Sequence, residues 1–363
     1  MTTQGVQAPA RFDHKQLTEF LTQVLIHLDV PPEDAAVTTA SLIEADLLGI
    51  DSHGIAQLAT RSMLYVQAMQ NGKTLVKAKP VIVRESASLA VVDGGAGIGQ
   101  VAANFAQELA MKKARETGMG GVAVRNSHHF GAAGVWALKA AEAGMIGMVV
   151  QNGGKLVAAA GGSERLFGTN PIAFAAPSEP HPFYVDFATS AVSLGKLQLA
   201  EIAGKTIPEG WAIDVEGHPS TDPKVFWQGG ALLPLGSTPT YSWHKGYALA
   251  FLVEILSGVL SAGITGVLDE FNKNYEHCHF HLAIDVGQAR PLGDFVGQMV
   301  EVETAVRQSR PADPERPVLI PGDMEFRNKA ERLEKGIPLH PTIVDGLVKL
   351  AEEYGLQAPT PLG

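Results

Sequence analysis

The spacing of apolar residues changes near Pro80, and this change constrains the possible folds more than any other feature of the 363-residue sequence. Before Pro80, apolar residues recur three or four positions apart, as they do on one face of a helix. After it, short β-branched runs alternate with helical stretches, which is typical of an α/β domain. The sequence therefore predicts a helical first third followed by an α/β middle.

The two ends of the chain are predicted to be mainly helical. Pro31-Pro32 separates the first helix from the second, and Gly49 ends the second. The expected helices cover residues 13–28, the stretch from Glu33 to Gly49, and residues of about 54–70, 293–308 and 341–354. This order suggests a discontinuous helical domain, residues 1–80 with 291–363, whose two parts pack together beside an α/β domain, residues 81–290.

Short runs rich in β-branched and aromatic residues are the predicted strands of the middle. They are residues 81–83, 90–92, 121–124, 147–150, 172–176, 183–187 and 278–285, with helices expected at 100–116, 131–143 and 246–262. The last helix belongs to an apolar stretch, Gly246–Leu268, that nearly reaches membrane-spanning length. Because this stretch contains Glu254 and several serines and glycines, we interpret it as a helix buried in a soluble core or a dimer interface.

Composition and charge exclude several classes of partner. The 28 Lys and Arg residues against 38 Asp and Glu residues give a net charge of −10, with no basic block, which argues against nucleic acid or an anionic membrane surface as a partner. The single cysteine, Cys278, cannot form an internal disulfide, so a reducing cytoplasm is the expected compartment. The first residues lack a charged segment followed by an apolar one, and we expect no signal peptide.

A glycine-rich loop follows the predicted strand at 90–92. Asp93 and the run Gly94-Gly-Ala-Gly-Ile-Gly99 resemble a nucleotide fingerprint, in which backbone N–H groups face a pyrophosphate. Gln100 stands where that fingerprint needs its third glycine or alanine. We therefore favour a tight turn that requires positive φ values over a phosphate loop.

Three groups of histidines are candidates for chemistry. His53 follows Ser52 between two predicted helices, where it is either an imidazole poised for proton transfer or part of a capping turn. His128 and His129 follow a strand and precede a helix, a position that gathers ligands in α/β proteins, although they also fit a polar loop. A third group, His277-x-His279-x-His281, places three imidazoles on one face of a strand. Since no second cluster with zinc-like spacing completes a site, we expect no metal there.

Several motifs in order along nearly the whole chain resemble the type 2 malate/L-lactate dehydrogenase family, which also holds ureidoglycolate dehydrogenase, diketogulonate reductase, sulfolactate dehydrogenase and cyclic-imine reductases. They are Ala45–Gly54, Asp93–Gln100, Arg125–Gly131, Phe167–Pro171, Asp186–Ser190, Gly229–Leu235, His244–Gly246 and Ile320–Gly322. The resemblance implies an oxidoreductase that uses NAD or NADP, a non-Rossmann mixed-sheet α/β fold, and a homodimer.

The resemblance also implies roles for particular residues. His53 matches the proton donor to the substrate carbonyl, assisted by Ser52, and His129 matches a histidine that is catalytic in some members. Thr169 matches a residue near the substrate, which is a small carboxylate. The implied cofactor contacts are His128, His129, Phe130, Gly131, Ala132, Asp186, Phe187, Ala188, Thr189, Ser190, Ser193, His244, Lys245, Gly322 and Asp323.

The sequence departs from the family at the residue expected to bind the substrate carboxylate. The usual arginine lies four residues after the histidine, and here that position is Gln57. Arg61 lies one helical turn further on, so we read a four-residue insertion with Arg61 as the bidentate clamp. Lys196 modestly favours a 2-hydroxy-acid dehydrogenase, because the cyclic-imine reductases carry an acid there. A cyclic-imine reductase, a metal-dependent hydrolase and a non-catalytic binding protein stay open as alternatives.

Overall fold

The computed structural model describes residues 9–60, 64–268 and 276–362. These residues form two compact units. One contains the described residues up to Lys77 together with those from Leu319 onward, and the other runs from Ala78 to Val318. Residues 291–318, expected in the helical domain, fall within the α/β unit. Each unit is described by itself.

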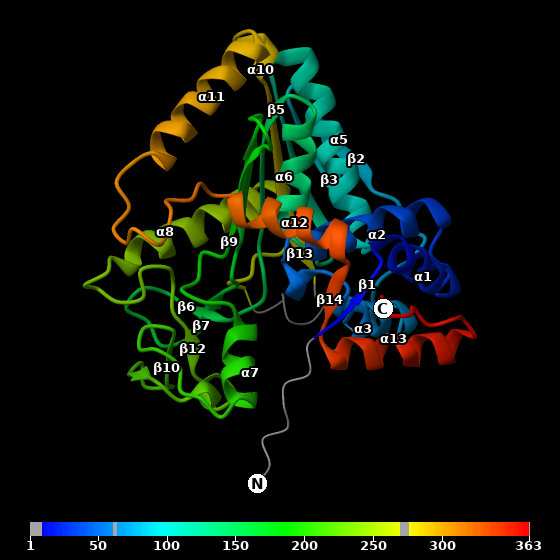
Figure 1. The fold of residues 1–363 in the computed structure, drawn as a ribbon, viewed down its shortest axis with the longest axis vertical. Coiled ribbons are helices and arrows are strands. Elements are labelled where there is room, and N and C mark those ends of the chain that lie inside the picture. Colours follow the sequence, from blue (N-terminus) through cyan, green and yellow to red (C-terminus); the bar gives the residue numbers. More distant parts are fainter. Residues whose placement is uncertain (1–8, 61–63, 269–275, 363) are drawn as a thin grey trace. The chain divides into compact units, whose positions relative to one another are not determined.

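A seven-stranded mixed sheet is the framework of the α/β unit (Figure 1). Its strands lie in the order β2-β3-β4-β13-β5-β8-β9, with β3 and β4 parallel and the other neighbouring pairs antiparallel. Every strand predicted from a β-branched run is present in this sheet. The strands are Val81–Glu85, Leu89–Asp93, Met119–Ser127, His277–Asp285, Met145–Gln151, Ile172–Ala176 and Phe183–Phe187, in the order of the sheet.

Helices cover both faces of the sheet. On one face, α5 (Gly99–Thr117) packs against β4 and β13, and α6 (Ala133–Glu142) packs against β5 and β8. On the other face lies α8 (Trp243–Glu254), which continues into the π-helix η3 (Ile255–Val259). Two further helices, α10 (Val286–Ala289) and α11 (Leu292–Arg307), follow β13. Among the described residues, no helix combines the length and apolarity needed to cross a bilayer.

A second sheet of short strands lies in the same unit. Its order is β11-β10-β12-β6-β7, and most of its strands contain two residues. It packs with α7 (Leu194–Ile202) and the 3₁₀ turn η2 (Pro223–Phe226) around an apolar cluster that includes Phe167, Leu197 and Leu232. These strands are β6 (Val157–Ala158), β7 (Arg165–Phe167), β10 (Ala212–Ile213), β11 (Pro219–Ser220) and β12 (Ala231–Leu232). Strands this short carry no periodicity, so the sequence did not predict them.

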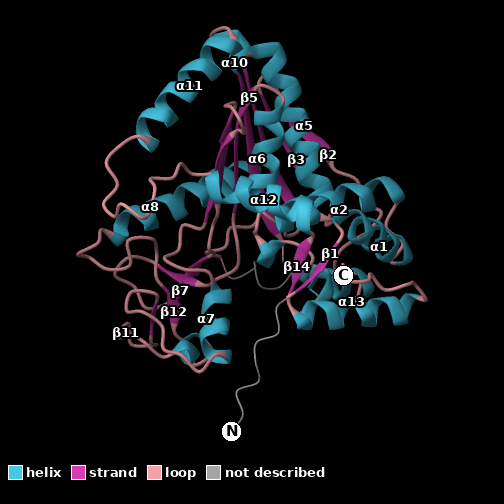
Figure 2. Cartoon of the chain, in the orientation of Figure 1, coloured by secondary structure: helices cyan, strands magenta, loops and turns pink. Residues whose placement is uncertain are grey.

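The terminal unit joins segments from both ends of the sequence. Strand β1 (Ala10–Phe12) pairs antiparallel with β14 (Ile337–Leu339), as Figure 2 shows in magenta. Its helices are α1 (His14–His27), α2 (Pro32–Leu47), the 3₁₀ turn η1 (Asp51–His53), α3 (Ala56–Ala59), α4 (Leu64–Gln70), α12 (Asp323–Lys335) and α13 (Pro341–Tyr354). The single helix expected at 54–70 was wrong, because Thr60 has an extended backbone and ends α3.

Candidate functional site

The turn that carries His53 is built around a buried carboxylate. Asp46, near the end of α2 and 2% exposed, accepts a hydrogen bond of 2.7 Å from the backbone N of Ile55. A side chain at Gly54 would overlap this carboxylate, so glycine is what allows the chain to pass so close to it. Burial raises the pKa of Asp46 well above its usual range. The sequence analysis missed this residue, although an acid in an apolar helix end was its signal.

The imidazole of His53 is held by its neighbour. Ser52 Oγ lies 2.8 Å from His53 Nδ1, and Gln57 Nε2 donates to the carbonyl oxygen of Ser52 at 2.5 Å. Burial lowers the pKa of His53, which favours the neutral ring. Arg61, the predicted clamp for a carboxylate, lies outside the described residues.

Helix α12 braces the same turn from the C-terminal part of the unit. Arg332 pairs with the carboxylate of Asp51 and donates to the carbonyl oxygen of Asp46, and Lys329 Nζ lies 2.6 Å from Glu44 Oε1. Asp51 therefore binds Arg332 and Ser52 binds His53, so neither caps the following helix; the N-cap residue of α3 is Ile55.

The predicted contacts Gly322 and Asp323 lie at the opposite end of α12. Gly322 is the N-cap residue with φ of 101°, and Asp323 Oδ2 accepts from the backbone N of Ile320 at 2.8 Å. One helix thus connects the Ile320–Asp323 turn to the turn that carries His53.

In the α/β unit, a β-bulge in β4 precedes the predicted cofactor loop. His277 and His279 of β13 pair with Ser127 and Val124, so Arg125 and Asn126 together face Cys278. Asn126 has φ of 50°, and Glu276 Oε1 accepts from its backbone N at 2.9 Å.

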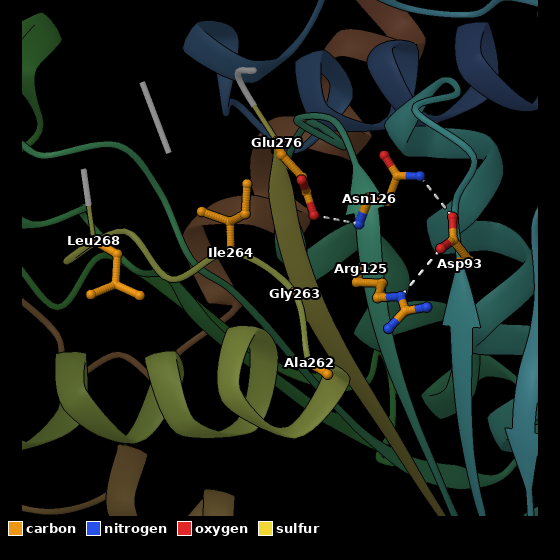
Figure 3. A pocket seen from close by; sticks show the side chains of 8 residues that line it. All are labelled: Asp93, Arg125, Asn126, Ala262, Gly263, Ile264, Leu268 and Glu276. Atoms are coloured by element: carbon orange, nitrogen blue, oxygen red, sulfur yellow. Dashed lines mark hydrogen bonds and ion pairs between the residues drawn. The ribbon is translucent and has the colours of Figure 1, made fainter. Parts of the chain in front are cut away.

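Asp93, at the end of the parallel strand β3, also holds this bulge. Its carboxylate accepts from Asn126 Nδ2 at 2.8 Å and from Arg125 Nε at 3.2 Å, as Figure 3 shows. These residues, with Glu276, line a pocket of about 420 Å³ whose apolar wall is Ala262, Gly263, Ile264 and Leu268. The pocket lies at the carboxyl ends of the parallel pair, where α/β sheets bind ligands.

The glycine loop after β3 is a tight turn. Gly95 and Ala96 have φ of 64° and 52°, and Gly97 N donates to the carbonyl oxygen of Gly94 at 3.0 Å. This agrees with the turn that the sequence analysis favoured.

The loop His128–Ala132 connects β4 to α6. Gly99, at the start of α5, lies so close to this loop that a side chain there would overlap the carbonyl oxygens of His128 and His129. Gly131 has φ of 84°, and its backbone N donates to His129 Nδ1 at 3.3 Å. Phe130 is fully buried. The loop is therefore fixed by its own glycine, by a buried ring and by α5.

Two other predicted cofactor segments and Thr169, which is predicted to lie near the substrate, are connected to this loop by a continuous series of contacts. Asp186 Oδ2 accepts from the backbone N of Gly134 in the first turn of α6 at 2.8 Å. Thr189 N donates to the carbonyl oxygen of Thr169 at 2.8 Å, and Leu235 N donates to that of Thr189 at 2.9 Å. Gly246 packs directly against the backbone of Leu235, since a side chain there would overlap it. Segments far apart in the sequence thus form one surface: 128–134, 169, 186–190 and 244–246.

The two helices that begin beside these segments differ in the charge of their first turns. Exposed His244 and Lys245 lie in the first turn of α8, which contains no acidic residue, so the helix dipole and Lys245 both favour an anion such as a pyrophosphate. The first turn of α6 already accommodates the carboxylate of Asp186. Ser193, the remaining predicted contact, is exposed at the start of α7.

Two of the alternating histidines of β13 are engaged in hydrogen bonds. His279 Nδ1 lies 2.8 Å from His281 Nε2, His279 Nε2 lies 3.2 Å from Ser127 Oγ, and His281 Nδ1 lies 3.0 Å from Gln107 Oε1. Hydrogen bonds thus engage all four ring nitrogens of the two buried histidines. The third, His277, lies beside His129, with ring centroids 5.8 Å apart.

A buried carboxylate on α8 holds the loops around Thr169, and the sequence analysis gave it no role. Glu254 accepts from Asn170 Nδ2 at 3.0 Å, from Gly266 N at 3.0 Å and from Asn152 Nδ2 at 3.3 Å. Burial raises its pKa. Glu254, the acid in the apolar stretch, therefore holds three segments of the α/β unit together, and these hydrogen bonds make its own burial possible.

Known proteins resemble this chain along most of its length. A sequence model described as malate/L-lactate dehydrogenase matches residues 12–348. The chain is 42% identical over 350 residues to a malate dehydrogenase of Pyrococcus abyssi (strain GE5 / Orsay), covering 96% of each chain. It is 39% identical over 230 residues to a Delta(1)-pyrroline-2-carboxylate/Delta(1)-piperideine-2-carboxylate reductase of Pseudomonas putida, covering 63% of this chain and 64% of the reductase. The crystal structure of malate dehydrogenase from Entamoeba histolytica superimposes with a TM-score of 0.92 at 32% identity, covering 97% of this chain and 100% of the other.

Proposed function

The chain belongs to the malate/L-lactate dehydrogenase family, and we propose that it transfers a hydride between NAD or NADP and a small 2-hydroxy acid or its 2-oxo acid. The observation that carries this proposal is the continuous surface of segments 128–134, 169, 186–190 and 244–246. Each of these segments contains residues expected to contact the cofactor or the substrate. We further propose that the cofactor is bound by a non-Rossmann domain inserted in a helical domain made of both ends of the chain.

The residues of the α/β unit suit the binding of a dinucleotide. Lys245 and the first turn of α8 would hold its pyrophosphate, and the loop His128–Ala132 would hold its nicotinamide half. When bound, the cofactor supplies or accepts the hydride. Asp186 accepts from Gly134 N in the first turn of α6, directly after the loop, and so helps to orient the loop.

The residues of the terminal unit suit the transfer of a proton. His53 would donate the proton to the oxygen of the substrate carbonyl, and Ser52 Oγ holds its ring through Nδ1. We assign the delivery of the proton to the other ring nitrogen, Nε2. The lowered pKa of His53 makes the protonated ring a stronger acid, which suits a donor to a developing alkoxide. His129 is the alternative donor.

A guanidinium is the group that best matches the substrate carboxylate, because it binds in a bidentate way. We assign this role to Arg61. Gln57 is the weaker candidate, because its amide nitrogen already donates to Ser52. Thr169, whose carbonyl oxygen is engaged by Thr189, would contact the substrate through its side chain.

A second candidate is the reduction of a cyclic imino acid. Its support is the 39% identity to the pyrroline and piperideine carboxylate reductase. Lys196, exposed on α7, favours the oxo acid.

Measurement of absorbance at about 340 nm tests both functions with purified protein. NADH and NADPH are each offered with a panel of 2-oxo acids and cyclic imino acids. We expect turnover of oxo acids, and we expect His53→Ala to lower kcat by about a hundredfold or more, the usual contribution of an acid–base group. His27→Ala, an exposed histidine on α1, is the control. Full activity of His53→Ala would show that another residue donates the proton. The absence of turnover with every compound of the panel would refute the proposed function.

We propose a homodimer as the working form and a reducing cytoplasm as its compartment. An apolar face on α8 and η3 supports the homodimer: Phe251, Leu252, Ile255, Val259 and Leu260 are 40–60% exposed. A single cysteine supports the compartment, and burial raises the pKa of the Cys278 thiol to about 12, which makes it unreactive.

A further inference from the structure

Four polar side chains form a hydrogen-bonded chain inside the α/β unit. It runs from Ser127 through His279 and His281 to Gln107 of α5, with distances of 3.2, 2.8 and 3.0 Å. The exposed fraction of each of these residues is at most 1%.

The contacts of this chain can all be satisfied at once. A neutral imidazole donates one hydrogen and accepts one, which matches the two hydrogen bonds that each ring makes. At the end of the chain, Ser127 Oγ lies 3.2 Å from His279 Nε2 and 3.5 Å from the carbonyl oxygen of His128. Both rings are neutral in this arrangement, which agrees with the low pKa that burial gives each of them.

An apolar core surrounds this chain, with Ala106, Ala110, Val122 and Val124 among its members. Polar side chains in such a place contribute little net stability compared with well-packed apolar ones, yet they fix one geometry, because each unpaired group would be costly. The chain is therefore suited to fixing the geometry of the residues that it touches.

It touches the predicted cofactor loop at two points. Ser127 is the last residue of β4 and directly precedes His128. The ring of Phe130 lies edge-on to His279, with centroids 5.1 Å apart, and 6.1 Å from the ring of His281. The β-bulge at Arg125–Asn126 directs Ser127 toward His279.

We propose that His279 and His281 are positioning residues that fix the loop His128–Ala132 through Ser127 and Phe130. The inference rests on the proposed function, in which this loop binds the cofactor. The two histidines do not touch the reacting atoms. Their role is to hold the loop in the conformation that binds, so that the loop need not be ordered at the moment of binding.

A pair of serine substitutions tests this role. Ser127→Ala removes the hydroxyl that contacts His279 Nε2 and the carbonyl oxygen of His128. The control Ser257→Ala removes an equally buried hydroxyl of the same unit, which donates to the carbonyl oxygen of Val253 at 2.6 Å. We expect Ser127→Ala to raise the dissociation constant of NADH or NADPH about fivefold, the effect of one ordinary hydrogen bond, with kcat at saturating cofactor nearly unchanged. Ser257→Ala should leave the dissociation constant unchanged.

Hydrogen exchange in the cofactor-free protein gives a second readout. The backbone amides of residues 128–132 should exchange faster in Ser127→Ala than in the native chain or in Ser257→Ala. Equal loop exchange in the two serine variants would overturn the proposal. If the native chain bound neither nucleotide, the proposed function would fail, but the exchange comparison would still test the positioning role.

Gln107→Leu tests whether the chain acts as a unit, because Gln107 contacts His281 at the far end. We expect this variant to raise the dissociation constant of the nucleotide as well. The double variant with Ser127→Ala should have a dissociation constant no higher than that of the single variant that binds less tightly. If the fold-changes of the two single variants multiply in the double variant, the two substitutions act independently, and the proposal would be overturned. If Gln107→Leu fails to fold, the comparison of Ser127→Ala with Ser257→Ala still tests the proposal.

Discussion

The two buried histidines of β13 should make the α/β unit sensitive to acid. Burial lowers the pKa of His281 from 6.5 to about 3 in the folded chain. Below pH 6.5 the unfolded chain therefore binds a proton at His281 that the folded chain does not bind. The free energy of unfolding falls as the pH falls, until it levels off near pH 3. Each pH unit within this window costs about 1.4 kcal/mol, so at about pH 4.5 His281 alone costs about 3 kcal/mol.

The substitution His281→Gln isolates this contribution. Glutamine keeps a polar side chain that can accept from His279 but does not titrate. We expect the variant to be less stable than the native chain at about pH 7.5 and this difference to shrink by about 3 kcal/mol at about pH 4.5. Buried carboxyl groups whose pKa is raised, such as Asp46 and Glu254, titrate in both proteins and cancel in the difference.

Urea unfolding followed by tryptophan fluorescence provides the measurement. The four tryptophans, Trp136, Trp211, Trp227 and Trp243, all lie in the α/β unit and report on its unfolding. His218→Gln, at a histidine whose side chain is 75% exposed, is the matched control. A stability difference between His281→Gln and the native chain that is the same at both pH values would refute the reasoning.

Two further substitutions test other parts of the structure. Arg332→Met removes the ion pair with Asp51 and the hydrogen bond to Asp46, so we expect kcat/KM to fall and the free energy of unfolding to drop by about 2 kcal/mol. Lys329→Met, on the same helix, is the control, because its ion pair is with Glu44 of α2 and not with the turn itself. An equal loss of activity in Lys329→Met would show that the effect does not come from the His53 turn. Val259→Glu should convert a dimer to a monomer in light scattering, because it places a charge on the apolar face of η3, whereas Val215→Glu, at a similarly exposed valine, should not. A native chain that is already monomeric would refute the proposed homodimer.

The large sheet could be predicted from the sequence because its strands are continuous β-branched runs. Ala90–Val92 and Gly147–Val150 are examples, and both lie within observed strands. The terminal helices were predicted for a similar reason, since their apolar residues keep helical spacing over several turns. Pairs such as Ala212–Ile213 and Ala231–Leu232 lack this length, and tertiary contacts alone define them as strands.

The geometry of the candidate site depended on contacts that spacing does not encode. The alternation of His277, His279 and His281 correctly placed them on one face of a strand. It could not indicate that two of the rings bond to each other, because that depends on Ser127 and Gln107 approaching from other elements. In the same way, Asp46 lies nine residues before Ile55 and accepts its hydrogen bond only because η1 turns the chain back.

The pairing of β1 with β14 has a consequence for biosynthesis. Arg11 lies opposite Pro338, so more than three hundred residues separate two neighbours in one small sheet. On the ribosome, the whole of the segment 78–318 emerges before β14 exists, and it can acquire its contacts first. Until β14 is made, the amino-terminal helices have an apolar surface exposed to solvent. They are therefore the part of the nascent chain that would most need a chaperone.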